Sequence, residues 1–208
     1  MPPALAYFHQ HPNFLPSDDL KALRGHILAC PYLGVNNLNR DFVGTRGFSI
    51  AFRRDGLEQV VEQFPFFAPY LERVLLPECN AFYLNPLLLT EGSRVDPHID
   101  RSLRSYCKTI APPAWVSVLY LEVPDPLRGG SLVLSQGKRQ VGQIRPKQNR
   151  LLYFQGDLTH AVQPLESPGS RLSLVCEQYE LDPLQWNQIP KMTIESRLRV
   201  KAQARTRP

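Results

Sequence analysis

The second half of the chain limits the possible folds most. From about residue 80, short strand-like runs rich in valine, leucine and aromatic side chains alternate with breaks that contain proline or glycine. We expect these strands at residues 81–84, 115–123, 131–134, 150–154 and 171–179. Many short strands at this spacing are typical of a sandwich or barrel. The sequence therefore predicts a mainly β body.

The first half has a different pattern. Ser17 is placed to cap a helix whose apolar residues fall on one face before Pro31. Further helical segments are expected at about residues 56–63 and 69–76, while the residues up to Pro16 suggest an irregular arm. With 208 residues the chain is long enough for one domain. We expect an arm and bracing helices in residues 1–79, a β core in 80–182 and a basic extension in 183–208.

The positive charge of the chain is concentrated at its C-terminus. Six of the 24 basic residues and one of the 19 acidic residues lie in residues 191–208, so the rest of the chain has 18 of each. A folded body without a basic field argues against nucleic acid as the partner. The tail is expected to be a solvated extension or, alternatively, a basic contact for an anionic partner.

The cysteines and the hydropathy pattern exclude several classes. Four cysteines lie far apart without a Cys-x-x-Cys pair, which argues against a zinc ribbon or a disulfide framework. No stretch of about 18 apolar residues suggests a membrane span, and the first residues lack the pattern of a secretory signal. We therefore expect a cytoplasmic protein without a membrane partner.

A histidine and a carboxylate with metal-ligand spacing follow the expected helices. His98 and Asp100 are two positions apart on an extended segment, so both side chains project from one face. The pair by itself is a weak signal, because most such pairs are surface polar residues. His9 and His11 have the same spacing but lie in the expected arm with no third ligand in view.

His160, at the end of an apolar strand and turn, can complete a set of two histidines and one carboxylate. Such a facial set leaves adjacent positions open on Fe(II), as oxygenases need in order to bind a bidentate co-substrate and O₂. A structural zinc site would be closed and would usually contain cysteine. His98, Asp100 and His160 are therefore the candidate metal ligands and catalytic residues.

Arg171 begins the next expected strand and is either a surface arginine or the anchor of that co-substrate. 2-Oxoglutarate would chelate iron at one end and bury its C5 carboxylate at the other, where a guanidinium is the natural partner. The charges of iron, Asp100 and Arg171 would then balance the two negative charges of 2-oxoglutarate.

These motifs resemble those of the 2-oxoglutarate/Fe(II)-dependent dioxygenases of the prolyl-hydroxylase type, the group of the prolyl 4-hydroxylases. The resemblance extends over about residues 83–179 and rests on ordered motifs. They are His98-Ile-Asp100, Val118-Leu-Tyr120-Leu, Gly129-Gly130-Ser-Leu132, Ile144-Arg-Pro146, Asn149-Arg150-Leu-Leu-Tyr-Phe154, His160-Ala-Val-Gln-Pro164 and Arg171-Leu-Ser173. It implies a double-stranded β-helix, a jelly-roll or cupin-like fold of the mainly β or α+β class, braced by N-terminal helices.

The resemblance also implies roles for further residues. Tyr120 would bond the C5 carboxylate that Arg171 holds, with β-core packing as its alternative role, and Leu132 would form an apolar wall beside it. Ser173 fits the Arg-x-Ser pattern of related enzymes, and Tyr83 is a looser candidate for co-substrate binding. Independently of the resemblance, Gly129-Gly130 is expected to serve the backbone, either by taking positive φ angles or by letting a strand start close to the mouth of the pocket.

The expected activity is hydroxylation of a prolyl residue in a protein or peptide, with Fe(II), 2-oxoglutarate and O₂ consumed and succinate and CO₂ released as co-products. Alternatives are hydroxylation of a free amino acid or small metabolite, and a β-helix that only binds a ligand. The substrate is not defined by the motifs, because it depends on the loops after Asp100 and Val123.

Overall fold

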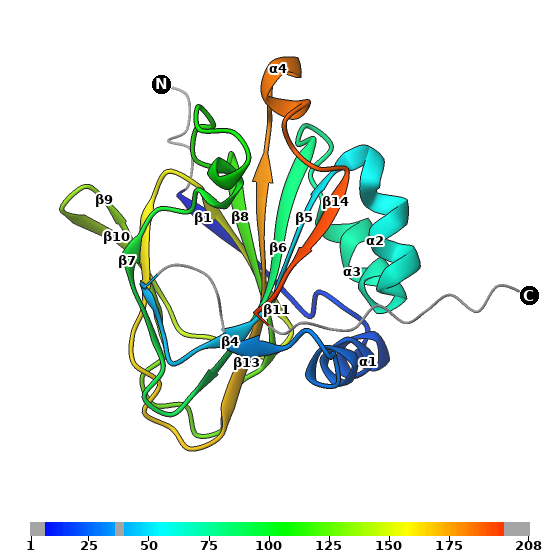
Figure 1. The fold of residues 1–208 in the computed structure, drawn as a ribbon. Coiled ribbons are helices and arrows are strands. Elements are labelled where there is room, and N and C mark those ends of the chain that lie inside the picture. Colours follow the sequence, from blue (N-terminus) through cyan, green and yellow to red (C-terminus); the bar gives the residue numbers. More distant parts are fainter. Residues whose placement is uncertain (1–6, 36–39, 198–208) are drawn as a thin grey trace, which may run out of the picture.

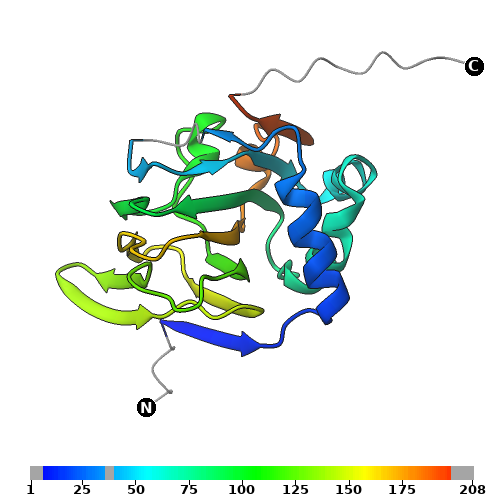
Figure 2. The same cartoon turned by 90° about the horizontal axis from the view of Figure 1, so that it is seen from below.

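Two antiparallel β-sheets face each other across an apolar interior, and helices cover the outer face of the larger sheet (Figures 1 and 2). This computed structural model describes residues 7–35 and 40–197. The basic residues beyond Arg197 lie outside the described residues. None of the helices described is long and apolar enough to cross a bilayer.

The larger sheet has nine strands and the smaller sheet has five. The larger contains β1 (Phe8–Pro12), β2 (Gly34–Val35), β4 (Arg46–Gly47), β5 (Ser49–Arg53), β6 (Ala81–Thr90), β8 (Trp115–Glu122), β11 (Arg150–Gln155), β13 (Ser170–Tyr179) and β14 (Met192–Glu195). The smaller contains β3 (Phe42–Val43), β7 (Arg94–His98), β9 (Leu132–Gln136), β10 (Arg139–Ile144) and β12 (Thr159–Val162). This arrangement is a double-stranded β-helix, as expected.

The helices form where the apolar spacing predicts them. The α-helices are α1 (Ser17–Leu28), α2 (Leu57–Gln63), α3 (Ala68–Val74) and α4 (Pro183–Trp186), and the 3₁₀ turns are η1 (Arg54–Gly56), η2 (Pro65–Phe67) and η3 (Ser102–Ser105). Leu20, Leu23 and Ile27 of α1 are buried in one apolar cluster with side chains of α2, α3 and the larger sheet. The helices therefore brace that sheet, which confirms the expectation.

Two terminal segments differ from the expectation. Residues 8–12 are not an irregular arm, because β1 pairs along its length with β11 and so becomes an edge strand. Within the expected extension, β14 pairs with β5, and the Ser196 hydroxyl donates to the Tyr32 carbonyl at 2.8 Å. Both segments depend on pairing with distant strands, which local sequence patterns do not reveal.

Truncations can separate β14 from the residues beyond it. Deletion of residues 198–208 should leave the melting temperature and 2-oxoglutarate decarboxylation unchanged, because β14 and its pairing with β5 are retained. Deletion from residue 190 onward should lower the melting temperature, because it removes a strand of the larger sheet. Thermal unfolding of the two truncated proteins tests this, and equal melting temperatures would contradict it.

The alternation of β13 determines what faces the interior. Its register with β6 is unbroken from Ser170 to Tyr179. Leu172, Leu174 and Cys176 pack with the helices. The residues of opposite parity, Arg171, Ser173, Val175 and Glu177, line a cavity between the sheets. One face of a single strand thus carries an arginine and a glutamate six residues apart, or about 20 Å of extended chain.

Candidate active site

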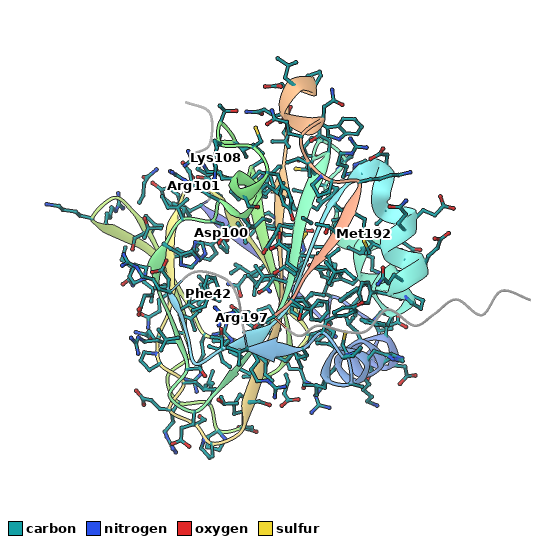
Figure 3. All side chains as sticks on the ribbon, in the orientation of Figure 1. Phe42, Asp100, Arg101, Lys108, Met192 and Arg197 are labelled. Atoms are coloured by element: carbon teal, nitrogen blue, oxygen red, sulfur yellow. The ribbon has the colours of Figure 1, made fainter. Side chains whose placement is uncertain are left out.

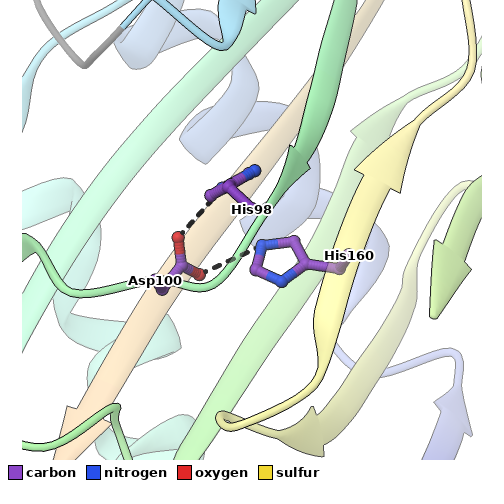
Figure 4. Close-up of side chains that lie close together, drawn as sticks. All are labelled: His98, Asp100 and His160. Carbon is purple, nitrogen blue, oxygen red and sulfur yellow. Dashed lines mark ion pairs between the residues drawn. The ribbon is translucent and has the colours of Figure 1, made fainter. Parts of the chain in front are cut away.

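The two candidate histidine ligands are cross-strand neighbours in the smaller sheet. His160 of β12 pairs directly with His98 of β7, and their ring centroids are 4.3 Å apart. Asp100 lies just beyond the end of β7, where the chain turns so that its carboxylate faces both rings (Figure 4). Its Oδ1 is 3.2 Å from Nε2 of His98, and its Oδ2 is 3.3 Å from Nε2 of His160.

Backbone carbonyls orient both imidazoles. Nδ1 of His98 lies 2.9 Å from the Asp96 carbonyl oxygen, and Nδ1 of His160 lies 3.2 Å from that of Leu158. A carbonyl can only accept a hydrogen bond, so each Nδ1 carries a proton, and Nε2, the nitrogen that faces Asp100, is the one available to a metal. Such an outer partner is what a metal-binding histidine usually has.

The three side chains converge without satisfying one another. Nε2 of His98 and Oδ2 of Asp100 are buried without a hydrogen-bond partner among the described residues. Burial opposes the ionisation of Asp100, but electrostatic attraction to the adjacent imidazoles, His160 before His98, holds the pKa of its carboxyl below the usual range. One ligand atom from each residue lies within 4.8 Å of the other two. Two imidazole nitrogens and one carboxylate fit Fe(II) with open positions.

Arg171 lies in the same cavity and is 2% exposed. Nη1 donates to the Gly130 carbonyl at 2.5 Å, and Nε donates to Oγ of Ser173 at 3.3 Å. No carboxylate of the described residues lies within 4 Å of its guanidinium. Burial lowers the pKa of this guanidinium, and a buried cation without a counter-charge is costly. The site therefore favours a bound anion.

Tyr120 lies beside Arg171. The Arg171 guanidinium lies 5.0 Å from the centre of its ring, and its hydroxyl is buried without a hydrogen-bond partner in the described residues. Burial raises the pKa of the Tyr120 phenol, with Arg171 opposing the shift, so the group remains a donor. A carboxylate would satisfy both this hydroxyl and Arg171. The hydroxyl without a partner fits the expected co-substrate.

The remaining predicted residues also lie at this cavity. Leu132 and Ser173 line it, and Ser173 pairs with Tyr120 across β13 and β8. Gly129 and Gly130 have φ angles of +64° and +65°, as expected for backbone glycines. Tyr83 lines the cavity as well, but its hydroxyl donates to Oε2 of Glu195 at 2.8 Å. A co-substrate role for Tyr83 stays a prediction.

The cavity has a volume of about 340 Å³ and reaches from Arg171 past the three candidate ligands to Glu177 and Glu195. Figure 3 shows Asp100 toward the middle of the molecule and Arg101 beside it. The Phe42 ring lies edge-on to His98, with centroids 5.1 Å apart, and the Phe154 ring is tilted against His160, with centroids 4.9 Å apart. The sequence analysis did not single out Glu177 or Glu195. Glu177 could have been found from the sequence, because it lies an even number of positions after Arg171 on one expected strand and so shares its face.

The sequence matches a known protein family over part of its length. Residues 83–176 match the family described as the 2OG-Fe(II) oxygenase superfamily. No curated protein matches the sequence.

Three solved structures have a similar fold. A Pseudomonas putida prolyl-4-hydroxylase is 20% identical, with 86% of this chain and 95% of that chain covered and a TM-score of 0.59. A Trichoplax adhaerens prolyl hydroxylase in complex with a hypoxia inducible factor peptide fragment is 18% identical, with coverages of 85% and 84% and a TM-score of 0.57. A collagen prolyl hydroxylase of Paramecium Bursaria Chlorella virus-1, in a 2OG complex, is 15% identical, with coverages of 85% and 97% and a TM-score of 0.53.

Proposed function

We propose that the chain is a 2-oxoglutarate- and Fe(II)-dependent dioxygenase that hydroxylates a prolyl residue in a peptide or protein. The match of residues 83–176 to the 2OG-Fe(II) oxygenase superfamily and the His98, Asp100 and His160 set support the dioxygenase activity. The prolyl substrate is supported by the similar folds of three prolyl hydroxylases, which is an argument by analogy. A cavity of about 340 Å³ that also holds the co-substrate has room for one side chain rather than a whole peptide.

We further propose a division of roles among the residues. His98, Asp100 and His160 would hold Fe(II), while Arg171 and Tyr120 would bind the C5 carboxylate of 2-oxoglutarate, with Leu132 and Ser173 beside it. The observation that carries this proposal is Arg171, a buried cation without a carboxylate partner in the same cavity as the His-Asp-His set. A dianion that reaches from the metal to Arg171 would complete both sites.

The bound iron would supply the oxidising chemistry, in which 2-oxoglutarate and O₂ give succinate and CO₂ while one C–H bond of the substrate becomes C–OH. The protein residues position the reactants. The carbonyls of Asp96 and Leu158 hold the ligand histidines in one tautomer. Phe42 and Phe154 cover the rings and exclude water beside the metal ligands.

Incubation with Fe(II), 2-oxoglutarate, O₂ and a panel of proline-containing peptides tests the proposed substrate. We expect succinate and hydroxyproline to form in equal amounts with at least one peptide. The prolyl assignment would be contradicted if no peptide gave hydroxyproline while a free amino acid or another metabolite was hydroxylated. That result would still be consistent with dioxygenase activity.

A substitution of Tyr120 separates co-substrate binding from packing. In Tyr120→Phe the ring that packs in the core remains, and only a buried hydroxyl without a partner is lost. The melting temperature without co-substrate should therefore not fall. The affinity for 2-oxoglutarate should drop roughly 10- to 100-fold, as a hydrogen bond to a charged group is worth about 1.5–3 kcal/mol. Unchanged affinity in calorimetry with Mn(II) would show that Tyr120 only packs.

A further inference from the structure

The end of the cavity opposite Arg171 is negatively charged. Glu177 lies six residues after Arg171 on the same face of β13 and is 4% exposed. Glu195, at the end of β14, lines the same end of the cavity and is half-buried. No lysine, arginine or histidine nitrogen of the described residues lies within 4 Å of either carboxylate. The cavity is therefore polar along β13, with the Arg171 cation at one end and the Glu177 and Glu195 carboxyl groups at the other.

The two glutamates differ in how much binding capacity they have left. Glu177 accepts hydrogen bonds from the Ser102 amide at 3.1 Å, from the Ser102 hydroxyl and from the Tyr179 hydroxyl. It therefore holds the segment that follows Asp100. Burial and, next, the charge of Asp100 raise the pKa of Glu177 to about 8, so a cation nearby would favour its ionised form.

Glu195 retains capacity for a ligand. Its Oε2 accepts from the Tyr83 hydroxyl at 2.8 Å, and its Oε1 accepts from the Tyr106 hydroxyl. A carboxylate has about four acceptor sites, so roughly two stay open. The two phenols come from β6 and from the segment after η3, and they fix the orientation of the carboxylate. A fixed acceptor without a cation partner, at the wall of a reaction cavity, is suited to a positively charged donor.

The charge balance of the cavity indicates that the positively charged donor suited to Glu195 belongs to the substrate. Arg171 and the metal site together would neutralise Asp100 and 2-oxoglutarate, so neither compensates the Glu195 carboxylate. The exposed Arg101 also lines the cavity but forms no ion pair with Glu195 among the described residues. Asn85 and Ser105 also line this part of the cavity and add polar groups. Buried charge without compensation is costly, so the group that enters beside the metal should bring positive charge.

We propose that the substrate carries a cationic nitrogen, an ammonium or guanidinium close to the carbon that is hydroxylated, and that Glu195 binds it. This inference rests on the proposed function and names the chemistry of its substrate. The cation has two possible sources: a lysine or arginine side chain next to the target residue in a peptide, or the free amino group of an amino acid or of a peptide N-terminus.

Binding of matched probes to the Mn(II)- and 2-oxoglutarate-loaded enzyme under anaerobic conditions tests the proposal. The peptide probes are N-acetylated, C-amidated tetrapeptides that contain Lys-Pro, Gln-Pro or Glu-Pro, and the free-amine probes are L-proline and N-acetyl-L-proline. We expect the cationic member of at least one set to bind roughly 10- to 100-fold more tightly than its uncharged or acetylated partner, the range for hydrogen bonds to charged groups. The set that shows the difference identifies the source of the cation.

Variants assign the effect to Glu195. In Glu195→Gln the cationic and uncharged probes should bind equally well. The 2-oxoglutarate affinity should not change, because Glu195 bonds Tyr83, the β6 partner of Glu177, and Glu177 lies six residues from Arg171 along β13. Glu62→Gln, a change of an exposed glutamate on α2, should retain the full preference. If Glu195 served only to hold β14, the Glu195→Gln variant would have a lower melting temperature but would still bind the cationic probes more tightly. The probe comparison on the wild-type protein requires no variant and so does not depend on the variant's folding.

Hydroxyproline formation, measured separately, distinguishes this inference from the proposed prolyl function. Tighter binding of a cationic probe without any hydroxyproline would retain the inference and contradict the prolyl substrate. The inference would be overturned if the Lys-Pro and Gln-Pro peptides bound equally well and the two free-amine probes also bound equally well. If both peptides were then hydroxylated equally, the proposal of a prolyl substrate would stand. Failure of every cationic probe to bind more tightly than its partner overturns the inference in any case.

Discussion

Replacement of Asp100 by alanine should abolish 2-oxoglutarate turnover and reduce metal affinity below the level that calorimetry detects. The change removes the only anionic member of the candidate ligand set and leaves His98 and His160 as two neutral donors. His98→Ala and His160→Ala should have the same outcome, because each leaves only two ligands. The fold should survive, since Oδ2 of Asp100 has no hydrogen bond to lose among the described residues.

Mn(II) titration of each variant, with far-ultraviolet circular dichroism as the folding check, measures this effect. His11→Ala is the matched control, because His9 and His11 have the same spacing as His98 and Asp100 but lie exposed on β1. The control should bind Mn(II) with wild-type affinity. Wild-type metal affinity and continued succinate formation in Asp100→Ala or His160→Ala would refute the assignment of the ligands.

Replacement of Arg171 by alanine should weaken 2-oxoglutarate binding by roughly two to four decades while metal affinity without 2-oxoglutarate stays nearly constant. A C5 carboxylate buried next to Tyr120 would lose its charge partner, and breaking such a buried pair costs about 3–5 kcal/mol. Arg171→Lys should recover part of the loss, because an ammonium retains the charge but cannot bond both carboxylate oxygens in one plane. The Gly130 carbonyl, which Nη1 contacts at 2.5 Å, also favours the guanidinium.

The measurement is a pair of anaerobic titrations of each protein, first with Mn(II) and then with 2-oxoglutarate. Arg139→Ala serves as the control, because Arg139 is an exposed arginine on β10. Equal 2-oxoglutarate affinity in wild type and Arg171→Ala would remove the co-substrate role of Arg171. A matching loss of Mn(II) affinity would instead indicate that the substitution disturbs the whole cavity.

The parts of the fold that the sequence predicted are those with local signals. The helix α1 begins at Ser17 and ends before Pro31, near where the apolar spacing and the proline suggest, although Pro16 and not Ser17 is its N-cap and no side chain caps it. β13 covers nearly the segment that its apolar run indicates. The edge strand β1 was missed, because its sequence, Phe-His-Gln-His-Pro, has no apolar alternation and it forms by pairing with β11. β14 was missed for the same reason, since its partner β5 is about 140 residues away in sequence.

The sequence likewise predicted the site residues that stand in motifs and missed the contacts that distant segments make. His98, Asp100, His160 and Arg171 stand in ordered motifs, so sequence spacing was sufficient to select them. The carbonyls that orient the histidines belong to the backbone, and no residue type announces them. Glu195 joins the cavity only through the pairing of β14 with β5 and its bonds to Tyr83 and Tyr106. Contacts made by distant segments were therefore the part that the sequence could not supply.

The most direct test of the central claim is whether 2-oxoglutarate binding depends on the metal. If one ligand reaches from the His-Asp-His set to Arg171, then saturating Mn(II) should tighten 2-oxoglutarate binding strongly, and 2-oxoglutarate should tighten Mn(II) binding by the same factor, since coupling between two binding sites is reciprocal. Anaerobic calorimetry of the wild-type protein, in both orders of addition, measures both factors. We predict that they are equal and at least about tenfold. Equal 2-oxoglutarate affinity with and without Mn(II) would contradict the claim that the three candidate ligands and Arg171 serve one co-substrate.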